Sequence, residues 1–83
     1  MTAKEAYELI SEQLKDFQIV KCMDYSSVFV FQFIPKNVEQ DEADHMIDCL
    51  RSVNKVTGVI RDFKPFHISI NEYTRGYQVH DFR

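Results

Sequence analysis

The stretch "VFVFQFI", Val28 to Ile34, has the pattern of a β-strand that is apolar on both of its faces. Successive side chains of a strand point to opposite faces of the sheet, and β-branched and aromatic residues favour this conformation. A strand of this kind needs cover on both faces. The two sets are Phe29, Phe31 and Phe33 on one face and Val28, Val30 and Ile34 on the other.

The residues before this strand follow a helical period. Apolar residues recur at three- and four-residue steps from Ala3 to Phe17, which is typical of an amphipathic helix. Thr2 and Glu5 have the spacing of a capping box, in which the threonine accepts from the Glu5 N–H and the carboxylate reaches back to the cap. We predict a helix over residues 3–15, then a first strand in "FQIVKCMDY" and a polar turn at "DYSS".

Beyond the apolar strand the chain turns back twice. Pro35 ends the strand because it has no N–H for the ladder, and "KNVEQDEAD" is an acidic connection that we expect to be a mobile loop.

The strand pattern resumes in "HMIDCLRSV" and in "VIRDF". Between them, Asn54 suits the first position of a type I turn and Gly58 suits the left-handed conformation of a bulge. We therefore predict a hairpin over residues 53–59. We prefer the hairpin to a phosphate-binding loop, because a loop of that kind would need several glycines and a helix after them.

The segment after Pro65, "FHISINEYTRGYQVHDFR", predicts one more short helix. Ser69 and Glu72 have the spacing of a second capping box, and Gly76 is placed to stop the helix. The whole order predicts a single α+β domain over residues 1–83. Its N-terminal helix packs on a four-stranded antiparallel meander within residues 17–63, and residues 66–83 form a C-terminal segment with a short helix.

Composition limits the class of protein. The 83 residues are 45% hydrophobic, with two Gly and two Pro, so we expect one folded domain. A net charge of -3 argues against nucleic acid and anionic membranes as partners. No apolar run approaches the roughly 18 residues of a membrane span, and the first residues lack the apolar core of a secretory signal. We expect a cytoplasmic protein in which Cys22 and Cys49 are free, mostly buried thiols.

The order of helix, strands and a closing "VNKVTGVI" hairpin resembles the PepSY-like small domains, whose last hairpin reads Val-Asp-x-x-Thr-Gly-x-Val. The resemblance spans Ala3 to Phe63, and it implies the same architecture and a role in binding or restraining peptidases. PepSY-type domains are typically exported or membrane-associated, whereas this chain opens without a signal-like core, inserts "PKNVEQDEAD" and continues past the hairpin. The chain also resembles short uncharacterised proteins of Gram-positive bacteria and their prophages. The positions that match the PepSY-like hairpin are Val53, Asn54, Thr57, Gly58 and Ile60.

A small metal-dependent or thiol-dependent enzyme is an alternative interpretation, and it would use three histidines and a cysteine. His45, His67 and His80 do not have metal-ligand spacing, and the acidic loop around His45 lacks the ordered ligands and the glycine of a calcium loop. Cys49 would need the fold to bring a base beside it. No G-x-S-x-G, H-E-x-x-H or P-loop motif is present. We therefore predict no catalytic residues, cofactor or metal.

Basic and aromatic residues interleave near the C-terminus and carry a second alternative, binding of single-stranded nucleic acid. Four charges make a weak patch, and core packing of the phenylalanines beneath Lys and Arg stems also explains them. The residues are Arg61, Lys64, Arg75 and Arg83 with Phe63, Phe66, Tyr73 and Tyr77.

The leading prediction comes from the two apolar faces of the central strand. One helix covers one face only, so either the segment 66–82 or a second chain must cover the other, since large apolar patches mark interaction sites. We predict a non-catalytic protein-binding module that forms a homodimer or binds another protein, encoded by a mobile element or prophage. The interaction candidates are Phe29, Phe31, Phe33, Phe66, Tyr73 and Tyr77.

Overall fold

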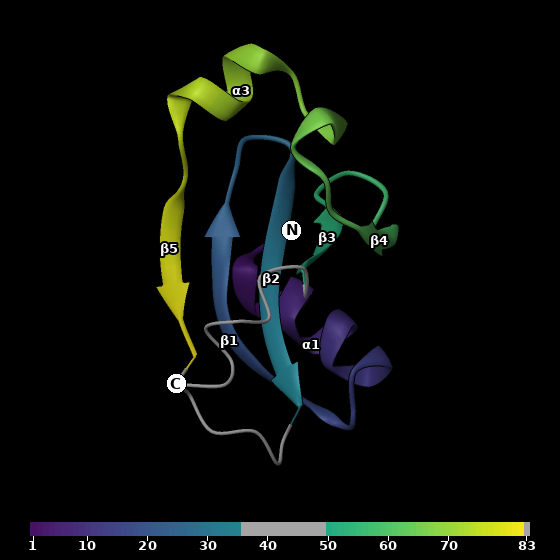
Figure 1. Cartoon of the computed structure of the whole chain (residues 1–83). Helices are drawn as coiled ribbons and strands as arrows, with labels where there is room; N and C mark the ends of the chain where they lie inside the picture. The colour runs from purple at the N-terminus through teal and green to yellow at the C-terminus, as the bar shows by residue number, and fades with distance from the viewer. Residues whose placement is uncertain (36–49, 83) are drawn as a thin grey trace.

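A computed structural model describes residues 1–35 and 50–82, and these residues form an α+β fold (Figure 1). Its helices are α1 (Ala3–Gln13) and the short α3 (Ile70–Arg75), with a 3-10 turn, η1 (Pro65–His67), before α3. Its strands are β1 (Phe17–Asp24), β2 (Val28–Pro35), β3 (Leu50–Asn54), β4 (Ile60–Asp62) and β5 (Gln78–Asp81).

The described strands form one antiparallel sheet in the order β4-β3-β2-β1-β5. The first four lie in chain order, as predicted, but β5 adds a fifth strand beside β1, with Cys22 opposite His80. The prediction of four strands was wrong in this respect. In "QVHD" Val79 is the only strongly apolar residue, so the alternating pattern that marks a half-buried strand is missing. Residues 78–81 are a strand because they pair with β1, and not because of a local sequence pattern.

Helix α1 begins where its sequence predicts. The Thr2 hydroxyl accepts from the Glu5 N–H, and the Glu5 carboxylate accepts from the Thr2 N–H, both at 3.2 Å, which completes the capping box. The helix ends at Gln13 rather than at Lys15, and Leu14 is its C-cap. Ala6 and Ile10 are fully buried against the sheet, so α1 covers the face that carries the three phenylalanines of β2.

The hairpin between β3 and β4 also forms as predicted, with Val53 opposite Ile60. The Gly58 N–H donates to the Asn54 carbonyl at 2.8 Å, and Gly58 has a φ of 74°. The Asn54 side chain accepts from the N–H groups of Val56 and Thr57 at 2.8 and 2.9 Å. The asparagine side chain thus accepts the hydrogen bonds of the turn, and the glycine adopts its left-handed backbone conformation. The loop is a tight turn that reverses the chain.

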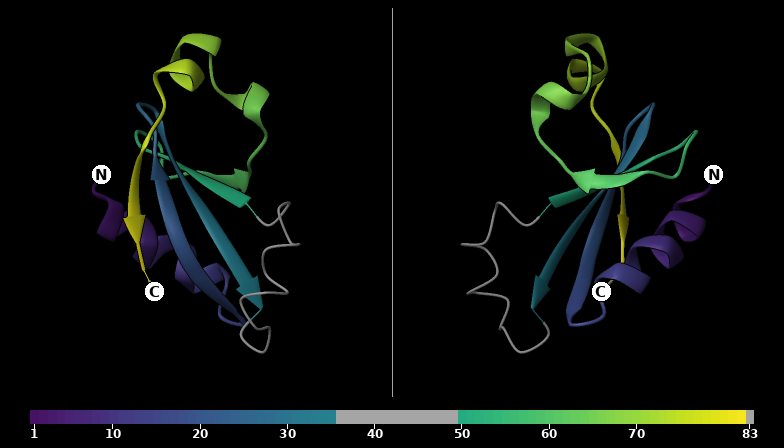
Figure 2. Two further views of the ribbon diagram at one scale, coloured as in Figure 1. Left: turned by 60° about the vertical axis from the view of Figure 1, so that its left-hand side comes forward. Right: turned by 90° about the vertical axis from the view of Figure 1, so that its right-hand side faces the viewer.

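The two faces of the sheet carry separate cores, and Figure 2 shows α1 on one side of the sheet and the chain around η1 on the other. The second face holds Tyr25, Val28 and Val30 together with Phe63 and Ile68. The chain after β4 therefore supplies cover for the second face, which was one of the two covers expected. The first cluster contains Ala6, Ile10, Leu14, Ile19, Cys22, Phe29, Phe31, Phe33 and Val53.

The end of the chain reaches the first cluster as well. Phe82 stacks on Tyr7 of α1, with ring centroids 4.5 Å apart, and lies 6.2 Å from the ring of Phe31. Cys22 is a free, buried thiol, as predicted, whereas Cys49 and the acidic connection lie outside the described residues. Neither described helix is long and apolar enough to cross a membrane.

Candidate functional site

Residues 63–77 connect β4 to β5 across one end of the sheet, and we call this segment the arch (Figures 1 and 2). Phe63 and Ile68 anchor its first half in the second core cluster. Tyr77 anchors its end, since its ring centroid lies 5.1 Å from that of the buried Tyr25. Between these anchors the arch holds η1 and α3.

A single carboxylate ties the middle of the arch to the sheet. Glu72 of α3 accepts from the Ser27 N–H at 2.6 Å, and the Ser27 hydroxyl lies 2.8 Å from both carboxylate oxygens. The Ser69 hydroxyl accepts from the Glu72 N–H at 3.1 Å, so the N-cap of α3 forms as predicted. The reciprocal half of the capping box was predicted wrongly, because the Glu72 side chain finds its donors in the β1–β2 turn.

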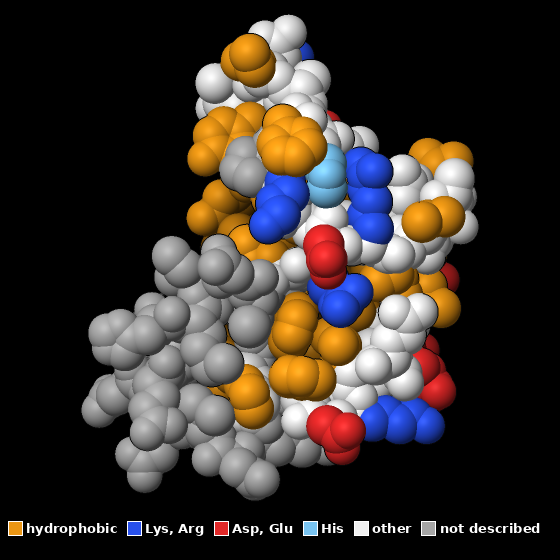
Figure 3. Space-filling view, turned by 45° about the vertical axis from the view of Figure 1, so that its right-hand side comes forward, with side chains coloured by type: hydrophobic (Ala, Val, Ile, Leu, Met, Phe, Trp, Pro, Cys, Tyr) orange, Lys and Arg blue, Asp and Glu red, His pale blue; other side chains and the backbone are white. Residues whose placement is uncertain are grey.

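The arch exposes large apolar side chains. Helix α3 has no buried residue, and Ile70 is 81% and Tyr73 51% exposed. Phe66 of η1 is 81% exposed and Tyr77 is 45% exposed. Figure 3 shows hydrophobic side chains gathered at this end of the molecule. A surface helix normally turns its apolar residues toward a core, so α3 departs from the usual arrangement.

Basic groups lie next to these apolar side chains. Arg61, Lys64 and Arg75 are exposed, and Figure 3 shows Lys or Arg side chains and a histidine directly below the hydrophobic group. His67 accepts from the Lys64 N–H through Nδ1 at 3.2 Å, and its ring meets that of Phe66 edge-on at 4.8 Å. The arch and the adjoining β4 therefore present exposed basic side chains although the chain as a whole is acidic.

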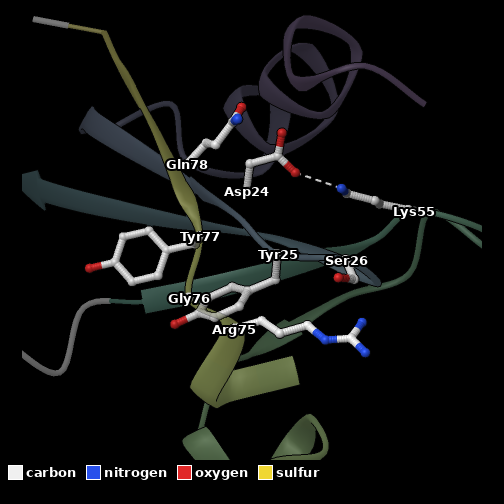
Figure 4. A pocket seen from close by; sticks show the side chains of 8 residues that line it. All are labelled: Asp24, Tyr25, Ser26, Lys55, Arg75, Gly76, Tyr77 and Gln78. Carbon is white, nitrogen blue, oxygen red and sulfur yellow. Dashed lines mark hydrogen bonds and ion pairs between the residues drawn. The ribbon is translucent and has the colours of Figure 1, made fainter. Parts of the chain in front are cut away.

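A pocket of about 430 Å³ opens where the arch meets β5, and all of its lining belongs to the described residues (Figure 4). Three separate segments form it: the end of β1 with its turn, the β3–β4 hairpin, and the junction of α3 with β5. Gly76 makes this junction with a φ of 81°, a conformation that favours glycine. The lining residues are Asp24, Tyr25, Ser26, Lys55, Arg75, Gly76, Tyr77 and Gln78.

Asp24 is the central charged group on one wall of the pocket. Its carboxylate lies 2.5 Å from Lys55 Nζ and 3.2 Å from His80 Nε2. Burial by itself would raise the pKa of Asp24, but the hydrogen bonds and charges of Lys55 and His80 outweigh it and lower the pKa below its usual value. Lys55 Nζ also lies 4.5 Å from the ring centroid of Phe29. This carboxylate is therefore already held by two partners.

The predicted interaction residues separate into two groups. Phe29, Phe31 and Phe33 are 2%, 0% and 7% exposed beneath α1, so these three belong to the core and offer no surface to a partner. Their assignment to an interface is corrected here, because α1 and Phe82 cover this face. Phe66, Tyr73 and Tyr77, by contrast, lie on the surface of the arch.

The residues of the enzyme hypothesis are not brought together in the described part of the chain. His67 lies in η1 and His80 in β5, while His45 and Cys49 fall outside the description. Residues 1–35 and 50–82 contain no group of three or more His, Cys, Asp or Glu that could hold a metal ion. Of the eight residues of the nucleic-acid hypothesis, Phe63 is buried at 8% and Arg83 lies outside the described residues, whereas the other six are exposed on the arch or on β4.

Sequence reasoning named Arg75 and Tyr77 but missed Asp24 and Lys55, which lie across the pocket from them in other segments. Asp24 and Lys55 are 31 positions apart, and Ser27 and Glu72 are 45 apart, so no local pattern connects them. The only available signal was the polar turn "DYSS" between two apolar strands. Comparison with known proteins adds no relative, since no family model, curated protein or solved structure matches this chain.

Proposed function

We propose that this chain is a small non-catalytic protein-binding module whose contact surface is the arch. The observation that carries the proposal is the exposure of Phe66, Ile70, Tyr73 and Tyr77 on one short segment. Clustered apolar side chains on a small domain mark interaction sites, and aromatic residues are enriched where binding energy concentrates. The partner is another protein or a second copy of the chain.

Aromatic residues and an arginine give this surface the usual composition of an interface. Aromatic residues together with arginine are enriched at the centres of protein interfaces, whereas Glu and Asp are depleted there. The arch combines Phe66, Tyr73 and Tyr77 with Arg75, and its one acidic residue, Glu72, is occupied by Ser27. Both features support binding through the arch rather than through the sheet, whose phenylalanine face is covered by α1.

Site-specific photocrosslinking tests this proposal. A photoreactive phenylalanine analogue replaces Phe66 in the chain expressed in its own host, and in a matched control it replaces Val56, which is 92% exposed on the hairpin. We expect a discrete crosslinked species from position 66 and none from position 56. A product of twice the chain mass identifies a homodimer, and any other mass identifies a different partner.

Two results would contradict the proposal. Crosslinks of equal yield from both positions would show that the arch has no selectivity, and no crosslink at all from position 66 would remove its role. Binding of a single-stranded oligonucleotide that falls steeply with salt would favour the nucleic-acid hypothesis instead.

We also propose that residues 3–63 form a PepSY-like unit, with α1 across one face of the meander β1 to β4, in a cytoplasmic protein encoded by a mobile element or prophage. The confirmed hairpin with Gly58 and the capped α1 support this architecture. The resemblance implies restraint of a peptidase, so the purified chain is expected to lower the activity of a peptidase that it captures. A captured peptidase with unchanged activity would exclude the inhibitory role.

A further inference from the structure

The pocket between the arch and the β1–β2 turn has one cation that no described residue pairs with. Asp24 and Lys55 neutralise each other across their ion pair. Arg75 is exposed, and among the described residues its guanidinium makes no hydrogen bond or ion pair, nor does the Ser26 hydroxyl. The lining carries two positive charges, on Lys55 and Arg75, and one negative charge, on Asp24. Its net charge is therefore +1.

Figure 4 shows how these groups are arranged. The Arg75 side chain extends from the end of α3 toward the side of the pocket where Ser26 and Lys55 lie, while the Tyr77 ring points the other way. Guanidinium groups bind carboxylates through two parallel N–H···O bonds, and a hydroxyl can donate a third. The positive charge and the unused donors therefore lie on the same side of one pocket of about 430 Å³.

Aromatic surface lies on the opposite side of the same pocket, where Figure 4 shows the Tyr77 ring. Tyr73 and Tyr77 flank Arg75 in the sequence and are 51% and 45% exposed. Tyr25 forms the floor at 4% exposure, and its pKa is raised, first by burial and then by the neighbouring Tyr77, Tyr73 and Glu72, so it stays a neutral phenol. A ligand that fits this arrangement carries a single carboxylate next to an apolar group.

We propose that this pocket binds an acidic side chain in a peptide segment of the partner, with the carboxylate on Arg75 and Ser26 and the adjacent apolar residue on Tyr73 and Tyr77. This inference rests on the proposed function and names the chemistry of the partner. The charge of the pocket and the aromatic surface beside it specify an acidic peptide with an apolar neighbour. A bare anion would leave that surface unused.

The test is an NMR titration of the full isotope-labelled chain with the dipeptide N-acetyl-glutamyl-phenylalanine amide. The matched probe is the glutaminyl analogue, which keeps the shape and removes the charge. We expect saturable shifts of the backbone amides of Ser26, Arg75 and Gln78 by the acidic dipeptide, and at least about tenfold weaker binding of the analogue, which corresponds to a difference of about 1.4 kcal/mol. Arg75→Gln should weaken binding by a similar factor, and Arg61→Gln, which removes an exposed arginine outside the pocket, should not.

Three results would overturn the inference: equal binding of the two dipeptides, unchanged binding by Arg75→Gln, or stronger shifts of the same amides by inorganic phosphate at equal concentration. The last would show an anion site without peptide preference. If the dipeptide did not bind as expected but position 66 still gave selective crosslinks, the proposed function would remain supported. Loss of the crosslinks together with specific dipeptide binding would instead reject the arch as the main contact surface.

Discussion

The carboxylate of Glu72 binds both the backbone N–H and the hydroxyl of Ser27, at 2.6 and 2.8 Å, although the two residues are 45 positions apart. It is the one hydrogen-bonded link between α3 and the β1–β2 turn in the described chain, and α3 itself buries no side chain. The position of the arch therefore depends on this contact and on the anchors at its two ends.

Glu72→Gln should loosen the arch without unfolding the sheet. A hydrogen bond to a charged group contributes about 1.5 to 3 kcal/mol when buried, and this pair is partly exposed, so we expect a loss of about 1 kcal/mol in the free energy of unfolding. Urea denaturation measures it, and hydrogen exchange should rise in residues 66–77 but not in β2. Glu12→Gln, on the exposed face of α1, is the control. Equal exchange in both variants would show that the contact does not hold the arch.

Asp24 should make the stability of the chain depend on pH. Its pKa in the folded chain lies below the ordinary value of 3.8, so its contribution is complete above about pH 4 and is lost as the pH falls through the folded pKa. We expect Asp24→Asn to cost about 1 to 3 kcal/mol at neutral pH, and the difference from the natural chain to shrink as the pH falls through that lowered pKa.

Urea denaturation at several pH values measures this difference. Asp62→Asn is the matched control, because the Asp62 side chain is 74% exposed and its ion pair with Arg51 lies at the surface. Such pairs contribute about 0 to 1 kcal/mol. A difference for Asp24→Asn that stays constant with pH would show that its carboxylate charge does not stabilise the fold.

Gly58→Ala should destabilise the hairpin through backbone strain alone. Among the described residues, an added Cβ would meet only the Met1 methyl group at 3.6 Å, an ordinary contact, but a φ of 74° costs an alanine about 1 to 2 kcal/mol. Gly58→Asn should cost less, since asparagine tolerates this conformation. Thermal or urea unfolding of the two variants gives the order. Equal stability of both would point to a change in the turn itself.

Cys22 should be inert in the folded chain. Burial, followed by the charge of Asp24, raises the pKa of its thiol to about 12. In a Cys49→Ser variant, which leaves a single thiol, we expect Ellman's reagent at about pH 8 to react on the order of a thousandfold more slowly than in denaturant, because reaction requires opening of the core. Rapid labelling of the native protein would show that the first core cluster opens readily.

The order of the first elements could be predicted because each depends on neighbours in the sequence. Thr2 caps α1 through Glu5, three positions away, and the alternation in "VFVFQFI" sets the two faces of β2. Asn54 and Gly58 make the hairpin turn through local bonds and a local dihedral angle. The amino-acid sequence by itself thus determined α1, the first four strands and the need for cover on both faces.

Only the tertiary structure decided which apolar residues are exposed and which are core. Phe31 and Phe66 have the same side chain, yet the first is buried beneath α1 and the second is 81% exposed on the arch. The strand β5, the Glu72–Ser27 contact and the charges around Asp24 also join residues distant in the chain. Such pairings are set by the free energy of packing the whole chain, which no local window of the sequence contains.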